Sequence, residues 1–177
     1  RLMSANDKLI TSLQLLGQSG CRIEYGNSVI FIDPYLSNSV QELDAPDLER
    51  LVPVPVWPED IKDVDWILIT HDHIDHCDPE TLPKIADASN ICQLIGPPPV
   101  VEKLISWGIS TQRCRSASES WLSISKSIKV KAVPAAHPVI KRDNNENLIA
   151  VGYLMEIDNK RLYLAGDTSV TEELINT

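Results

Sequence analysis

The sequence predicts a single α/β domain over residues 1–177, and three features carry this prediction. Hydrophobic residues make up 43% of the chain, which is enough for one core without disulfides or a structural metal. Between residues 64 and 108 the apolar pattern alternates as strand, helix, strand and helix. On both sides of that block, short runs rich in β-branched residues predict further strands. We therefore expect one α/β core in which strands outnumber helices.

The first three strands are predicted at residues 12–16, 21–25 and 28–33. Two short turns separate them, one at residues 17–20 with a glycine at each end and one at Gly26-Asn27. Because tight turns join antiparallel neighbours, the chain should open with an antiparallel meander.

Residues 34–58 are predicted to form a long loop, because proline, aspartate, serine and glutamate replace the apolar pattern there. Prolines surround Val54, Val56 and Trp57 within it. A loop of this length in a compact domain usually either has a function or is disordered. Two interpretations stay open: a lid that places Trp57 over a site, or a plain excursion on the surface.

A block of alternating strands and helices follows the loop. Its predicted elements are strands at residues 64–70 and 91–95 and helices at residues 78–88 and 98–107. The first strand is apolar almost throughout, which is typical of a strand buried on both faces. Asp78 as N-cap and Pro79 at the first helical position mark the start of the first helix, and Gly108 marks the end of the second.

The remainder of the chain is predicted to be mostly strand. Four apolar runs are bounded by turn residues, at residues 121–125, 128–134, 149–157 and 161–165. Residues 158–160 join the last two strands. A short helix is expected after Asp167.

The formal net charge of -9 argues against nucleic acid as a partner, because phosphate backbones bind clustered lysines and arginines. A small-molecule substrate is expected instead. Residues 1–6 are polar, and no apolar run reaches the length of a signal sequence or membrane span, so we expect no membrane partner and a cytoplasmic location. The four cysteines lack C-x-x-C spacing, which predicts buried free thiols.

The residues most informative about chemistry are His71-Asp72-His73-Ile74-Asp75-His76. Neutral imidazoles and carboxylates are ligands of zinc, manganese and iron. The motif begins where a buried strand should end, and an irregular loop lets these side chains converge where a regular strand would separate them. Unrelated surface histidines are the alternative, and such spacing would rarely arise among them. The motif therefore predicts a metal site.

His137 and Asp167 extend this pattern into the C-terminal half. His137 is the one histidine of the sequence outside the motif, and it also follows an apolar strand. Alone, it would more often be a structural or surface residue, but beside the first cluster it is a candidate ligand. Asp167, preceded by Gly166, either caps the short helix after it or supplies a carboxylate that bridges two cations.

The combination of His-x-His-x-Asp-His, a distant single histidine and Gly-Asp-Thr resembles the metallo-β-lactamase superfamily. Asp33, which follows an apolar strand, also resembles a recurrent early feature of that superfamily. A narrower similarity is to the branch that contains L-ascorbate-6-phosphate lactonase. The segments that carry it are Thr70 to His76, Ile95-Gly96-Pro97, Trp107-Gly108-Ile109 and Arg113-Cys114.

The resemblance implies an αβ/βα sandwich and two divalent metal ions, zinc or manganese, with iron also compatible with these ligand types. The implied ligands are His71, His73 and His137 for the first ion, and Asp75 and His76 for the second, with Asp167 between them. The superfamily usually adds one more histidine to the second site, and none follows Asp167. We therefore expect an incomplete second site and a fold that lacks part of its C-terminal half.

These features predict a metal-dependent hydrolase that uses a metal-activated water on a small ester, lactone or phosphorylated substrate. Asp75 would be the catalytic residue, orienting the water or carrying its proton. The sequence contains no Gly-x-Ser-x-Gly motif, which disfavours a covalent serine mechanism. A phosphorylated lactone would require a phosphate-binding group. Lys141 or Arg142 is the candidate, although a basic pair beside Asp143-Asn144-Asn145 is more often part of a solvated loop.

Two alternatives to this function stay open. The first is a phosphodiesterase of the same fold, and the second is a metal-binding but catalytically inactive domain, as the missing histidine would allow. A homo-oligomer is also expected, because an incomplete half would leave an exposed sheet edge.

Overall fold

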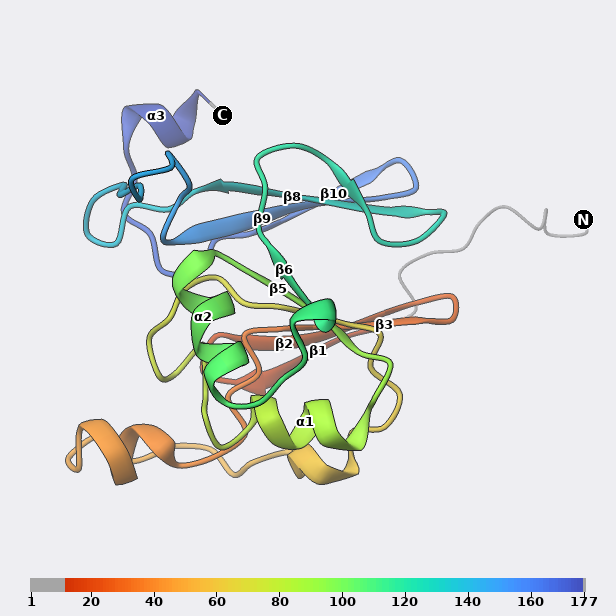
Figure 1. Cartoon of the computed structure of the whole chain (residues 1–177), viewed down its shortest axis with the longest axis vertical. Helices are drawn as coiled ribbons and strands as arrows, with labels where there is room; N and C mark the ends of the chain where they lie inside the picture. Colours follow the sequence, from red (N-terminus) through yellow and green to blue (C-terminus); the bar gives the residue numbers. More distant parts are fainter. Residues whose placement is uncertain (1–11, 177) are drawn as a thin grey trace, which may run out of the picture.

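The computed structural model describes residues 12–176, so the polar stretch at residues 1–6 lies outside the described range. Two β-sheets face one another, and helices lie against one of them (Figure 1). The six-stranded sheet contains β1 (Ser12–Gly17), β2 (Gly20–Tyr25), β3 (Ser28–Ile32), β4 (Trp66–Leu68), β5 (Gln93–Gly96) and β6 (Cys114–Ser116). The four-stranded sheet contains β7 (Leu122–Ser123), β8 (Ile128–Pro134), β9 (Val151–Ile157) and β10 (Lys160–Leu164). The helices are α1 (Leu82–Ala88), α2 (Pro98–Ser106) and α3 (Glu172–Ile175), and shorter helical turns lie at Val40–Asp44, Pro58–Asp60 and Thr111–Arg113.

The six-stranded sheet is mixed and runs in the order β1-β2-β3-β4-β5-β6. Its first three strands pair antiparallel, which confirms the predicted meander. From β3 to β6 the pairing is parallel. Parallel neighbours need long crossover connections, and α1 and α2 supply those from β4 to β5 and from β5 to β6. The carboxyl ends of β3, β4 and β5 consequently lie at one edge of the sheet, where the polar residues after each strand can meet.

Two hydrophobic cores hold the layers together. The first lies between the six-stranded sheet and the helices, and it joins Ile67 to Leu82 and Leu104. The second lies between the two sheets and contains Ile30 and Met155. The central strands β3, β4 and β5 are therefore covered on both faces, which explains why they are apolar almost throughout.

Helix α1 begins at Leu82, later than the predicted start at residues 78–79, whereas its predicted end is confirmed. Asp78 closes a turn before the helix: its Oδ1 accepts a hydrogen bond from Glu80 N at 2.9 Å, and its Oδ2 accepts one from Ser37 Oγ at 2.6 Å. Because the side chain of Asp78 bonds to Ser37 in a distant loop, the regular helix begins later than predicted. None of the helices within residues 12–176 has the length and apolar character needed to cross a membrane.

The strand predictions need three corrections. β4 stops before Thr70, because the amide of Thr70 donates to the side chain of Asp33 instead of to a neighbouring strand. The strand predicted at residues 121–125 is reduced to the two residues of β7. The strand β6 carries no apolar run, so no pattern in the sequence predicts it.

Hydrogen bonds also join the two sheets beside the edge where β4 ends. Tyr153 on β9 is buried, and its hydroxyl donates to Ile69 O at 2.8 Å. Val151 N on the same strand donates to Thr70 O at 2.9 Å. Because Ile69 and Thr70 follow β4 directly, these bonds fix the end of β4 against the second sheet.

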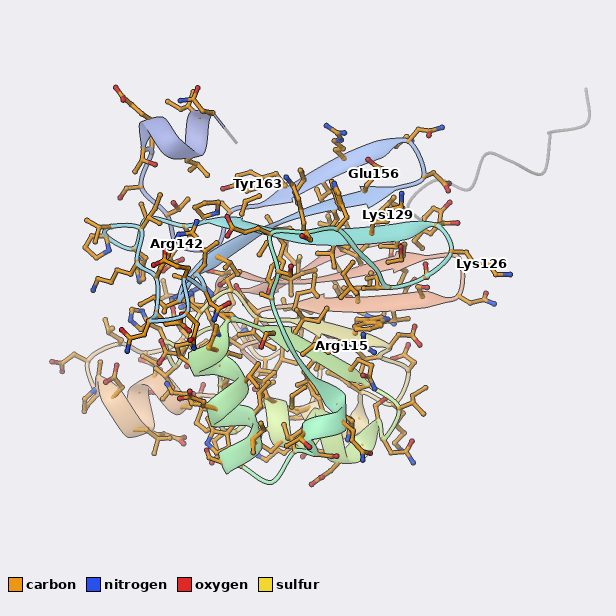
Figure 2. All side chains as sticks on the ribbon, turned by 45° about the horizontal axis from the view of Figure 1, so that its top comes forward. Arg115, Lys126, Lys129, Arg142, Glu156 and Tyr163 are labelled. Atoms are coloured by element: carbon orange, nitrogen blue, oxygen red, sulfur yellow. The ribbon has the colours of Figure 1, made fainter. Side chains whose placement is uncertain are left out.

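The substitution Tyr153→Phe should lower the free energy of unfolding by about 1–3 kcal/mol, because Ile69 O becomes a buried acceptor without its donor. Urea denaturation followed by circular dichroism measures this loss. Tyr163→Phe is the matched control, since Tyr163 on β10 is 45% exposed and its loss of a hydroxyl should leave stability unchanged (Figure 2). Equal stabilities of Tyr153→Phe and the parent protein would contradict this role of the hydroxyl.

Candidate metal centre

The segment from His71 to His76 forms a tight loop directly after β4. Its backbone closes on itself, because the amides of His76 and Cys77 donate to His73 O at 3.0 and 2.7 Å. The turn brings the rings of His71 and His76 to a centroid distance of 4.2 Å. The imidazoles of this loop therefore converge, as their spacing predicts.

His137 joins this loop from the second sheet, where it follows the end of β8. Its ring centroid lies 4.8 Å from those of both His71 and His73. Its Nε2 lies 3.0 Å from His73 Nδ1. All four histidines of the sequence thus belong to one cluster.

Asp167 reaches the same cluster from the loop after β10. Its carboxylate lies 3.3 Å from His76 Nε2 and 4.0 Å from His137 Nε2. The loops of Asp167 and His137 are bound to each other, because Ala136 N donates to Thr168 Oγ1 at 2.9 Å. His137 and Asp167 therefore reach the cluster from the second sheet, on two loops that are hydrogen-bonded to each other.

The backbone conformation and the close packing at position 166 explain why a glycine precedes Asp167. Its φ is +60°, a conformation that favours glycine. A Cβ at this position would lie 2.9 Å from Thr70 Cβ. Only a glycine thus lets the Asp167 loop approach the end of β4.

Two sets of side chains present ligand atoms within 4.8 Å of one another: His71, His73 and His137, and His71, His76 and Asp167. His71 belongs to both sets. Asp75 lies outside them at the edge of the cluster, with its Oδ2 3.5 Å from His76 Nε2. Asp72 also lies outside both sets and pairs with Lys103, whose Nζ lies 3.2 Å from its carboxylate. The structure thus gathers five of the six predicted ligands and leaves Asp75 beside them.

Asp33 supports the cluster from the end of β3, where it is buried and has a φ of 42°. Its Oδ1 accepts a hydrogen bond from Thr70 N at 2.8 Å, and its Oδ2 accepts one from Thr70 Oγ1 at 2.7 Å. The same Oδ2 lies 2.8 Å from His76 Nδ1. The carboxylate thereby assigns the proton of His76 to Nδ1, which leaves the lone pair on Nε2.

Thr70 orients His71 in the same manner. Its single hydroxyl proton is donated to Asp33, so its Oγ1 acts as an acceptor toward His71 Nδ1 at 3.1 Å. Nδ1 of His71 therefore carries the proton, and its Nε2 also presents a lone pair.

The Nε2 atoms of His71 and His76 are buried and have no hydrogen-bond partner among the described residues. Burial, followed by the charges of the neighbouring histidines, lowers the pKa of His71 to about 3, so its imidazole is neutral at pH 7. Leaving buried polar atoms without partners costs free energy. A divalent cation suits several neutral imidazoles and a carboxylate, so the residues present fit a metal. This cluster is able to bind metal.

The pKa of His76 shifts in the opposite direction. Burial lowers it, but the hydrogen bond to Asp33 and the charges of Asp33, Asp75 and Asp167 outweigh burial and raise it. A cation that binds Nε2 must displace a proton that these carboxylates favour. Protonation and metal binding therefore compete at His76.

A cavity of about 1030 Å³ lies beside the cluster. His73 and Asp75 line one side of it, and residues within the segment 35–51 line the other. That segment contains the helical turn Val40–Asp44, drawn in orange at the lower left of Figure 1. Trp57 does not line the cavity and is 62% exposed, whereas residues within 35–51 of the same predicted loop do line it.

Lys141 and Arg142, the candidates for binding a substrate phosphate, do not line this cavity. Arg142 lies on the loop between β8 and β9 (Figure 2) and donates two hydrogen bonds to the carboxylate of Glu119, at 2.8 and 3.2 Å. The phosphate-binding role expected of this pair is therefore wrong for this cavity.

Thr70 and Lys103 are two residues of the site that the sequence does not single out. Thr70 has a signal in retrospect, because a hydroxyl at the end of a buried strand is placed to bind the residues that follow it. Lys103 has none, because it reaches Asp72 across 31 residues, from the middle of α2. Only the folded arrangement of α2 beside the loop reveals that contact.

Known proteins resemble this chain over most of its length. Residues 29–177 match a family model described as Beta-lactamase superfamily domain. A UPF0173 metal-dependent hydrolase of Pyrococcus abyssi is 28% identical over 170 residues, which cover 93% of this chain and 65% of that protein. An N-acyl-phosphatidylethanolamine-hydrolyzing phospholipase D of Caenorhabditis elegans is 24% identical over 162 residues, covering 86% of this chain and 45% of that protein. The chain spans 42% to 65% of the length of such curated relatives.

Among solved structures, a possible metal-dependent hydrolase of Veillonella parvula superposes with a TM-score of 0.70 at 20% identity, covering 95% of this chain and 67% of that chain. A structural similarity at 20% sequence identity shows the fold alone. This fold is the metallo-β-lactamase fold that the sequence predicts. The family model independently covers the three strand ends that build the metal centre. The chain therefore belongs to the family of β-lactamase superfamily domains.

Proposed function

We propose that this protein is a metal-dependent hydrolase that acts on a small ester, lactone or phosphorylated compound. The observation that carries the proposal is the pair of buried, unpartnered Nε2 atoms of His71 and His76, placed where His73, His137 and Asp167 converge. Similarity to a protein named as a metal-dependent hydrolase supports the same function.

The cluster would hold two divalent cations. The proposed ligands are His71, His73 and His137 for the first ion and Asp75 and His76 for the second, with Asp167 between the two. His71 also presents a ligand atom within 4.8 Å of those of His76 and Asp167, so it borders both ions. Imidazole and carboxylate suit zinc or manganese, and iron is a further candidate. When bound, such cations supply Lewis acidity and lower the pKa of a coordinated water.

Asp75 is the proposed catalytic residue. Its side chain is 33% exposed, lines the cavity and lies 3.5 Å from His76 Nε2. A carboxylate in this place can orient a water molecule and accept its proton. Asp33, in contrast, is buried and bonded to Thr70 and His76, which makes it a positioning residue.

The branch of L-ascorbate-6-phosphate lactonase is the finer proposal for the reaction. Its support is the segment Ile95-Gly96-Pro97, which begins in β5 and follows it at the edge where the cluster lies. A phosphodiesterase is the second candidate, and the similarity to the phospholipase D of Caenorhabditis elegans favours it. An inactive metal-binding domain is the third. Turnover assays with an ester, a lactone and a phosphodiester on metal-loaded protein distinguish the three.

We also propose a cytoplasmic location and self-association. The cysteines within residues 12–176 are all free thiols, as is usual in a reducing compartment. β1 lies at an edge of the six-stranded sheet, and Leu13 and Leu15 on it are 49% and 75% exposed. An exposed edge strand offers a template for pairing with a second copy.

The substitution His71→Ala should remove more bound metal than His137→Ala, because His71 belongs to both ligand sets and His137 to one. We expect His71→Ala to weaken the binding of both ions by at least about 100-fold, since losing even an outer partner of a ligand costs roughly 10–100-fold. Elemental analysis after dialysis against a weak chelator gives the metal content of each variant. Equal metal loss in the two variants would show that His71 is not shared.

Metal binding should release protons from His76, since its raised pKa leaves more of it protonated near neutral pH than an ordinary histidine. The release should decline as pH rises above the pKa of His76, and metal affinity should fall as pH falls. Calorimetric titration of zinc in buffers of different ionisation enthalpy counts the protons.

The matched variant for this measurement is Asp33→Asn, which removes the hydrogen bond and the charge that raise the pKa of His76. At saturating zinc and pH 7, this variant should release fewer protons for each ion bound than the parent protein. An unchanged number would rule out His76 as the source.

The substitution Asp75→Asn should lower kcat by about 100-fold to 10,000-fold while the first ion stays bound, because the amide cannot accept a proton from water. The kcat is measured with a chromogenic ester, and the metal content of the same sample is measured alongside. Asp87→Asn is the control, since Asp87 is exposed and belongs neither to the ligand sets nor to the cavity lining. Full turnover by Asp75→Asn with both ions in place would exclude Asp75 as the base.

A further inference from the structure

The residues that line the cavity beside the cluster indicate the charge and polarity of the substrate, which the metal ligands do not. Its metal side includes His73 and Asp75, and its opposite side is formed by residues 43–51, which we call the loop wall. His73 belongs to one of the two ligand sets, so a molecule in this cavity lies directly beside the candidate metal centre. A substrate whose reacting group lies at the cluster must therefore rest its remaining part against the loop wall.

Acidic side chains outnumber basic ones around this cavity. Two cations line it, Arg50 and Lys103. Five carboxylates line it: Asp44, Asp47, Glu49, Asp72 and Asp75. Within the described part of the chain, no cation forms an ion pair with the three carboxylates of the loop wall.

Arg50 is bound to the protein rather than presented to a ligand. Its Nη1 donates to Tyr35 O at 2.7 Å, and its Nη2 donates to Leu16 O at 2.8 Å. Its Nε donates to Val52 O at 2.8 Å. All three nitrogens of the guanidinium therefore fasten the loop to β1 and to itself.

Lys103 is also committed within the protein. Its Nζ donates to the carbonyl of Asp72 and lies 3.2 Å from the carboxylate of the same residue. Both cations of the lining are thus held by bonds within the protein. On the loop wall itself three carboxylates stand against the single guanidinium of Arg50, so that side of the cavity carries a net negative charge.

The loop wall also presents apolar side chains. Leu43, Leu48 and Leu51 line the cavity and are 62%, 62% and 96% exposed. They are interspersed in sequence with the three carboxylates of the wall. Exposed leucines at the side of a cavity lose contact with water when an apolar group binds against them.

We propose that the substrate carries, beyond its scissile bond, an apolar chain that bears a positive charge and no negative one. This inference rests on the proposed hydrolase function and narrows it: it favours an ester or lactone over a substrate that carries a phosphate on this part, and so disfavours the L-ascorbate-6-phosphate lactonase branch. A cleft lined by one sign of charge concentrates ligands of the opposite sign. A phosphate or carboxylate in that part of the substrate meets carboxylates that have no cation partner in the described structure.

Three p-nitrophenyl esters with acyl chains of matched length test the proposal: the 4-(trimethylammonio)butanoate, the pentanoate and the monoglutarate. At low ionic strength we expect kcat/KM for the cationic ester to exceed that for the anionic ester by about tenfold or more. The ratio should shrink as salt is added, because the screening length falls to about 10 Å at 0.1 M. Equal or faster hydrolysis of the anionic ester overturns the proposal.

A triple variant, Asp44→Asn with Asp47→Asn and Glu49→Gln, removes the charges of the loop wall and leaves every proposed metal ligand in place. It should lower the ratio of cationic to anionic turnover by at least about threefold. The matched control is Glu59→Gln with Asp60→Asn and Asp87→Asn, which changes net charge equally at exposed positions outside the cavity lining. An identical fall of the ratio in both triple variants attributes the preference to net charge alone and overturns the proposal.

Failure of the hydrolase function can be distinguished from failure of this inference. If the metal-loaded protein hydrolyses no ester, lactone or phosphodiester, the proposed function fails, and the binding of two unreactive probes decides the inference. Calorimetry on the zinc-loaded protein should show hexyltrimethylammonium binding about tenfold more tightly than hexanesulfonate, with the preference weakened in the triple wall variant. Sulfonate binding that is as tight as ammonium binding overturns the inference.

Discussion

The buried carboxylate of Asp33 contacts both Thr70, which lies just beyond the end of β4, and the imidazole of His76 in the candidate metal centre. Its oxygens accept the amide and hydroxyl protons of Thr70 and face Nδ1 of His76. A buried charge is tolerated only where such bonds surround it. Through Thr70 the same carboxylate also decides which nitrogen of His71 carries a proton. The lone pairs offered to a metal thus depend on one residue that lies outside the ligand sets.

This arrangement works against the stability of the metal-free protein. Four imidazole rings are held with neighbouring centroids 4.2 to 4.8 Å apart, and two of their nitrogens are buried without partners. The pKa of His71 is about 3 in the folded protein against an ordinary value of 6.5. Between those values the unfolded chain binds more protons than the folded one, so acid favours unfolding. A bound cation relieves both costs, which couples the filling of the site to the stability of the fold.

The sequence predicts those features of the fold and site that depend on residues close together in the chain. Strands buried on both faces appear as apolar runs, and Gly108 ends α2 within a residue or so of the predicted point. The ligands His71, His73 and His76 are close in sequence, and His137 and Asp167 each follow a strand. In contrast, the delayed start of α1 depends on Ser37, and the pairing of Lys103 with Asp72 spans 31 residues. Such contacts leave no local pattern, because only the packed sheets bring their partners together.

The candidate metal cluster and the loop wall lie on parts of this fold that are held in place by different contacts. The metal cluster lies at strand ends that two hydrophobic cores and the Tyr153 hydroxyl hold in place. The loop wall lies on a segment that Arg50 fastens through backbone carbonyls, which any side chain in the wall leaves intact. Residues of the wall can therefore change without disturbing the anchor or the ligands. Substitutions in the wall of such a fold can change which substrate charge and shape it accepts, while the metal centre stays the same.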